Sequence, residues 1–103
     1  MKHDFSALYA CYPDVIQQME DVFTSHEFIL KLAHQHERMY VEALYSYRDS
    51  LHRGRPTPFR AVHDILSKHL RTLPGLVTYL GEVQSEDIFK QSNNCAQWRR
   101  VGA

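Results

Sequence analysis

The chain has 103 residues, a mass of 12.1 kDa and a formal charge of zero, and 44% of its residues are hydrophobic. This length predicts one domain, 1–103, and the hydrophobic content excludes a disordered chain. No apolar run approaches the ~20 residues that span a bilayer, so we expect no membrane partner and a cytoplasmic location.

The first expected helix begins near Pro13, a residue suited to an opening helical turn. The apolar positions that follow lie on one helical face and continue to Phe23. Thr24 and Glu27 then have the spacing of a capping box, in which the Thr24 hydroxyl accepts from the Glu27 amide and the Glu27 carboxylate reaches back. The sequence therefore predicts that one helix ends and a second begins at this point.

The second expected helix runs from Ser25 to Leu51 with an almost uninterrupted apolar stripe. At ~1.5 Å per residue it would reach roughly 40 Å, more than a domain of this size needs to cover its own core. We therefore expect the stripe to bury part of its surface against a second copy of the chain, which predicts a homo-oligomer. The residues assigned to this self-association are Tyr40, Leu44, Tyr45 and Tyr47.

The segment 52–58 contains Gly54, Pro56 and Pro58 and is the clearest loop. Thr57 is a good N-cap and Pro58 a good first helical residue, and the apolar face that follows predicts a helix over 58–72. Pro74 and Gly75 break the chain again. The apolar residues of 76–80 predict a short helix over 75–81, closed by Gly81.

The tail from Glu82 fits two structures, a helical turn or a hairpin with strands at 83–90 and 95–101 around the turn signal of 92–94. Favouring the hairpin gives a mainly α domain of four helices with a C-terminal β-hairpin. This element order resembles that of a winged helix, with 58–72 and 75–81 as the helix-turn-helix pair; the likeness is an analogy of order alone. Trp98 is expected to anchor the tail to the helices, because its side chain is the largest one to bury there.

Motifs for catalysis are missing from the sequence. It contains no GxSxG, P-loop, GxGxxG or HExxH motif, so we expect no enzyme, no catalytic residues and no cofactor. Seven histidines are many for this length, but His34 and His36 would point about 200° apart on a helix and could not chelate one ion, so no metal site is expected. Cys11 and Cys95 have no zinc spacing and are expected to be reduced thiols.

The charges divide unevenly along the chain. Residues 1–47 hold three basic and seven acidic groups, whereas residues 48–103 hold nine basic and five acidic ones. A surplus of cations can attract an anionic partner such as nucleic acid. The arginines assigned to phosphate contacts are Arg53, Arg55, Arg60, Arg99 and Arg100.

These features favour a small, non-enzymatic binding or regulatory module that contacts nucleic acid through its basic second half. Binding should be weak and tolerant of sequence, because the expected helix 75–81 lacks the Arg, Lys, Asn and Gln side chains that read base edges. Two alternatives remain at this point. The first is a homodimeric protein-interaction domain or a subunit of a larger assembly, and the second is a small enzyme or metal-binding protein.

Overall fold

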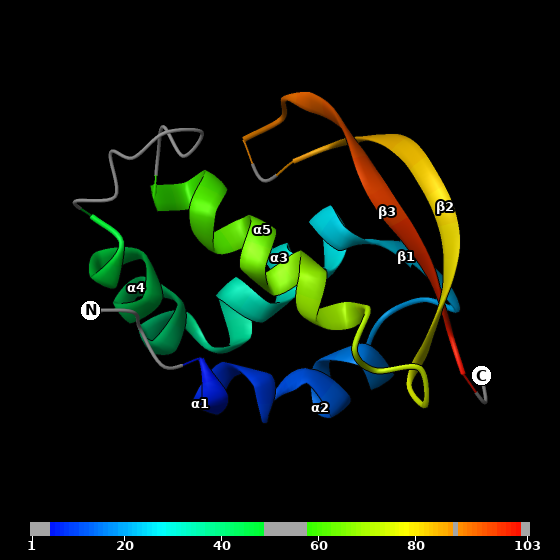
Figure 1. Cartoon of the computed structure of the whole chain (residues 1–103), viewed down its shortest axis with the longest axis horizontal. Helices are drawn as coiled ribbons and strands as arrows, with labels where there is room; N and C mark the ends of the chain where they lie inside the picture. The colour runs from blue at the N-terminus through cyan, green and yellow to red at the C-terminus, as the bar shows by residue number, and fades with distance from the viewer. Residues whose placement is uncertain (1–4, 49–57, 88, 102–103) are drawn as a thin grey trace.

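In the computed structural model, which describes residues 5–48, 58–87 and 89–101, a layer of helices packs against a three-stranded antiparallel sheet (Figure 1). The strands are β1 (Val22–Thr24), β2 (Val77–Glu86) and β3 (Ser92–Arg100), in the order β1-β3-β2. The helices are α1 (Ser6–Tyr9), α2 (Tyr12–Gln17), α3 (Ser25–Gln35), α4 (Glu37–Ser46) and α5 (Pro58–Leu70). The sheet joins residues near the start of the chain to its C-terminal segment.

The mainly α class predicted from the sequence is wrong, because the chain is an α+β mixture. Residues 77–81, which were predicted to belong to the helix 75–81, instead lie in the strand β2. Tyr79 of β2 lies opposite Trp98 of β3. Val77, Thr78 and Tyr79 are β-branched or aromatic, residue types that pack well across a strand. The predicted helix-turn-helix pair of 58–72 and 75–81 is therefore wrong, and so is the winged-helix element order that depends on it, because α5 is followed by a strand.

The tail does form a hairpin, but from other residues than expected. Its strands are β2 and β3, and residues 87–91 connect them. Asn93 and Asn94, expected in the turn, belong to β3 and pair with Ser85 and Gln84.

Two of the expected helices are shorter than their apolar patterns indicate. The helix from Pro13 was expected to reach Phe23, but α2 ends at Gln17 and Phe23 belongs to β1, where it is buried. The helix over 25–51 is broken at His36, whose backbone leaves the helical region at φ −127° and ψ 50°. The break lets α4 turn back onto α5 and α1, so much of the apolar stripe is buried within the chain's own core. Residues 49–51 lie outside the described residues.

The capping box at the start of α3 is confirmed. The Thr24 hydroxyl accepts from the Glu27 amide at 3.2 Å, and the Glu27 carboxylate accepts from the Thr24 amide at 2.8 Å. These bonds pair two of the backbone donors that a helix start otherwise leaves free. The helix α5 begins at Pro58 as expected and ends at Leu70, and the predicted cap at Thr57 lies outside the described residues.

Replacing Thr24 by alanine should lower the free energy of unfolding by about 1 kcal/mol, since this is the typical loss when a side-chain N-cap is removed. Urea denaturation followed by circular dichroism would measure the change. Thr24→Ser is the matched control, because serine keeps the hydroxyl and should retain most of the stability. Equal stability of the alanine variant and the native chain would show that the cap contributes nothing.

The core lies between the helices and the inner face of the sheet. Tyr12, Phe28 and Leu66 have no exposed surface, and Phe23 and Trp98 of the sheet are 1% exposed. The Tyr12 hydroxyl donates to the Leu66 carbonyl oxygen at 2.6 Å, so the one polar atom of this buried ring is satisfied. This bond ties α2 to α5 and helps to fix the position of α5.

Candidate functional site

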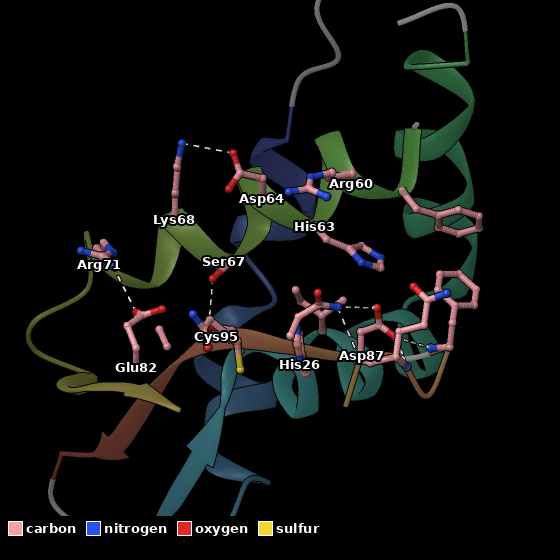
Figure 2. A pocket seen from close by; sticks show the side chains of 18 residues that line it. His26, Arg60, His63, Asp64, Ser67, Lys68, Arg71, Glu82, Asp87 and Cys95 are labelled. Atoms are coloured by element: carbon pink, nitrogen blue, oxygen red, sulfur yellow. Dashed lines mark hydrogen bonds and ion pairs between the residues drawn. The ribbon is translucent and has the colours of Figure 1, made fainter. Parts of the chain in front are cut away.

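A cleft of about 1060 Å³ lies between α5 and the hairpin of β2 and β3 (Figure 2). The polar side of α5 forms one wall, and the hairpin with its connecting turn forms the other. Ser25, His26 and Ile29 line it from the first turns of α3. Three segments far apart in the sequence therefore meet in one concave site, which is the usual form of a binding site.

The basic groups of the cleft come from α5 and the turn after it. Arg60, Lys68 and Arg71 all line the cleft, and Figure 2 shows them along the α5 side. The spacing of Arg60 and Lys68 places them within about 80° of each other around the helix. The side chains of Lys68 and Arg71 are 69% and 57% exposed. These cations are therefore accessible to an anionic partner.

Three acidic groups, Asp64, Glu82 and Asp87, line the same cleft and balance the formal charge of the three basic ones. Asp64 pairs with Lys68 at 3.1 Å, and Glu82 lies 3.9 Å from Arg71. Exposed pairs of this kind contribute little to stability and exchange partners readily, because water and salt screen them. An incoming phosphate would thus compete with Asp64 and Glu82 for the two cations, which predicts modest affinity for anions.

The turn of the hairpin is held in one shape by Asp87. Its carboxylate accepts from the backbone amides of Phe89 at 2.8 Å and Gln91 at 3.0 Å, and from the Asn93 side chain at 3.2 Å. The bonds from the Gln91 and Phe89 amides, together with nearby histidines, lower the pKa of Asp87 below its usual value. Lys90 in this turn has a positive φ of 67°, and it is exposed. Gln91, Asn93 and Asn94 add amide groups to the cleft.

Two histidines, His26 and His63, line the cleft near Asp87. Burial, opposed by Asp87 and aided by His26, lowers the pKa of His63 to about 4. His63 Nε2 shares a hydrogen bond with the buried Tyr40 hydroxyl, and burial raises the pKa of Tyr40 to about 12. The Nδ1 atom of His26 is buried and has no hydrogen-bond partner among the described residues. Because its pKa is about 4, His63 is uncharged at neutral pH and adds no cation to the site.

The structure does not bring together the arginines that the sequence assigned to phosphate contacts. Arg60 lines the cleft, whereas Arg53 and Arg55 lie outside the described residues. Arg99 is exposed on β3 and is not part of the cleft lining. Arg100 donates to the Asp21 carboxylate at 3.0 Å and to the Gln17 carbonyl oxygen at 3.2 Å, so it holds the end of β3 against the start of the chain.

The sequence reasoning missed Lys68 and Arg71. Their distances along the chain from Arg60, eight and eleven positions, are those of residues on one helical face, and this signal was available. Helical spacing could not identify the amide side chains of the hairpin, because Asn93 and Asn94 were predicted to lie in a turn.

Of the residues assigned to self-association, Tyr45 alone is largely exposed. Its side chain is 63% exposed, and the Arg48 guanidinium lies 4.0 Å from its ring centre. Tyr40 is buried at 7% exposure, and Leu44 and Tyr47 pack against the core. Most of the stripe thus has an intramolecular role, and self-association through it stays a prediction.

The described residues offer little for metal or nucleophilic chemistry. Within them, no group of three His, Cys, Asp or Glu side chains is placed to hold a metal ion. Cys11 Sγ lies 3.5 Å from His36 Nδ1, but burial and the nearby Asp14 raise the pKa of this thiol, which disfavours the thiolate that a nucleophile needs. Cys95 is buried beside the cleft.

In the described part of the chain, no helix has the length and apolar character needed to cross a membrane. Comparison with known proteins adds no candidate: no family model, no curated protein and no solved structure matches the chain significantly.

Proposed function

We propose that the chain is a non-enzymatic binding module for nucleic acid and that the cleft between α5 and the hairpin is its contact surface. The observation that carries the proposal is the row of Arg60, Lys68 and Arg71 along one wall, opposite the amides of the hairpin. Cations on one surface suit phosphate groups, and amide side chains suit the edges of bases. Lys90 adds a further exposed cation at the tip of the turn.

The charge balance of the cleft supports weak and sequence-tolerant binding. Asp64 and Glu82 compete for Lys68 and Arg71, so each phosphate contact gains only part of the energy that a free cation would provide. Gln91, Asn93 and Asn94 are exposed, but the Asn93 amide already donates to Asp87 and the Asn94 amide oxygen accepts from Gln84. The Gln91 amide offers both a donor and an acceptor that can adapt to different bases. A module of this kind would position a nucleic acid rather than select a sequence.

Affinity for a fluorescently labelled DNA oligomer should fall as salt rises, with a logarithmic slope of about −2 to −3 for three contacts. Fluorescence anisotropy between about 50 and 200 mM salt would measure the slope. The double variant Arg60→Gln and Lys68→Gln should bind more weakly and with a slope smaller by about 1.5, because two phosphate contacts are lost.

Arg99→Gln is the matched control for this measurement. It removes one exposed arginine that does not line the cleft, so affinity and slope should stay unchanged. The proposal fails if no binding is detected at low salt, or if Arg99→Gln weakens binding as much as the cleft variants do. In the second case the cations of the sheet end, rather than the cleft, would be the contact surface.

A further inference from the structure

One end of the cleft carries a pair of exposed aromatic rings. Phe59 comes from the first turn of α5 and Phe89 from the turn of the hairpin. Their ring centres are 4.8 Å apart with an interplanar angle of 77°, and both rings line the cleft. Although the two rings contact each other, Phe59 is 39% exposed and Phe89 is 50% exposed. Two large apolar side chains therefore meet at the surface and leave ring area open to solvent.

Both rings are held in place by their surroundings. The Asp87 carboxylate accepts from the Phe89 amide, and the Lys90 amide donates to the Asp87 carbonyl oxygen at 3.0 Å, so the backbone amides of Phe89 and of the residue after it are both bonded. Phe59 also meets the edge of the His63 ring, with 5.9 Å between centres. A rigid aromatic surface loses little conformational freedom when a ligand binds to it.

We infer that Phe59 and Phe89 form a stacking platform for an unpaired base, so that the cleft takes a single strand in preference to a duplex. This inference rests on the proposed nucleic-acid function and names the form of nucleic acid that the site accepts. Aromatic rings beside a row of cations are the combination by which proteins hold single strands, since every base has a face that can stack. In a duplex those faces are covered by the neighbouring bases.

The shape of the cleft also disfavours a duplex. A helix that reads a duplex enters the major groove, which is about 12 Å wide, with its polar side free of other protein. The polar side of α5 instead forms a wall of the cleft and faces the hairpin. A single strand can pass between these walls, with its phosphates toward Lys68 and Arg71 and one base at the aromatic end.

The test compares three labelled probes of equal phosphate number in the same anisotropy assay: an oligothymidylate of about 15 nucleotides, the same strand with abasic sites throughout, and a duplex. The oligothymidylate should bind the native chain most tightly. Phe89→Ala should weaken its binding by about tenfold, whereas Phe89→Trp should keep or improve it. The abasic strand, which has no base to stack, should bind native protein and Phe89→Ala equally.

Leu80→Ala is the control, since Leu80 is 39% exposed on β2 and does not line the cleft. Circular dichroism would confirm that every variant is folded. The inference is overturned if the duplex binds more tightly than the single strand, or if Phe89→Ala changes nothing. If the cleft cations still govern binding in those cases, the proposed function stands without the aromatic platform. Failure of all three probes to bind would reject both proposals.

Discussion

Replacing Trp98 by alanine should reduce the free energy of unfolding by about 3 to 5 kcal/mol, a large part of the ~5 to 15 kcal/mol that a domain has. The side chain is 1% exposed and lies on the inner side of the central strand β3. Its ring packs against Tyr79, with 5.4 Å between ring centres, and Phe23 is its partner across the strands in β1. Truncation would leave a cavity where the sheet meets the helices.

The hydrogen bonds of Trp98 add to this expected loss. Its Nε1 donates to the Ser25 hydroxyl at 2.9 Å, and the Ser67 hydroxyl donates to the same oxygen at 2.8 Å. Ser25 is the buried polar residue at the first turn of α3, and these bonds join β3, α3 and α5 at one atom. Removing the indole leaves this buried oxygen with one donor fewer, which has its own energetic cost.

Urea denaturation followed by far-ultraviolet circular dichroism would measure the change, because the alanine variant has no tryptophan left to fluoresce. Trp98→Phe is the matched control: it keeps an aromatic ring but loses the donor, so its loss should be smaller than that of the alanine variant. A loss below about 1 kcal/mol for Trp98→Ala would show that the ring is not the anchor of the sheet.

The parts of the fold that could be predicted from the sequence are those set by neighbours in the chain. The capping box at Thr24 and Glu27 depends on residues three positions apart, and it forms as expected. The start of α5 depends on Pro58, and it is also where expected. The burial of Trp98 follows from its large apolar area alone.

The incorrect predictions involve contacts between distant segments. The apolar run of 76–80 fits a short helix and a strand equally well. It forms a strand because residues from Val77 onward pair with β3. Phe23 fits the helical pattern of its neighbours, but its pairing with Trp98 places it in β1. The break at His36 has no Gly or Pro signal, and the packing of α4 on α5 that accompanies it lies beyond any local pattern.

The candidate site was predicted only in part for the same reason. Grouping arginines by their place in the sequence selected Arg99 and Arg100 with Arg60. In the fold, Arg100 donates a hydrogen bond to Asp21, which is distant in the sequence. The cleft is lined by Lys68 and Arg71 together with Arg60. The helical periodicity predicted from Pro58 onward places Lys68 and Arg71 on the same face as Arg60. The position of the hairpin opposite this face depends on the pairing of β2 with β3, which no local pattern predicts.

Acid should destabilise the chain between about pH 6.5 and pH 4, and His63 should account for much of the loss. Burial lowers the pKa of His63 from 6.5 to about 4, so the unfolded chain takes up a proton at a higher pH than the folded chain does. Stability from neutral His63 is therefore fully present above about pH 6.5, falls as the pH drops, and levels off below about pH 4.

The groups that face His63 come from every element around it. Tyr40 on α4 shares a hydrogen bond with its Nε2, His26 on α3 lowers its pKa and Asp87 of the hairpin turn raises it. The full shift corresponds to about 3 kcal/mol, and because part of the ring faces solvent, screening reduces the expected effect to about 2 kcal/mol. Burial also lowers the pKa of His69, which stacks on Tyr9 and adds a loss of the same sign.

His63→Gln should flatten this dependence, since glutamine cannot titrate but can keep a hydrogen bond with Tyr40. Unfolding free energies from urea titrations at about pH 7 and about pH 4.5 would give the slope for each variant, and the slope rather than the absolute stability is the readout. His34→Gln is the matched control, because it makes the same exchange at an exposed position of α3. Protonation of Asp87 has little effect on the slope between these two pH values. The lowered pKa of Asp87 adds a loss that grows as the pH falls through the unfolded value of 3.8, so most of that loss lies below the lower of the two measurements. An unchanged slope in His63→Gln would mean that the ring is hydrated in solution, and the part of the cleft around His63 would then be open to water and to charged ligands.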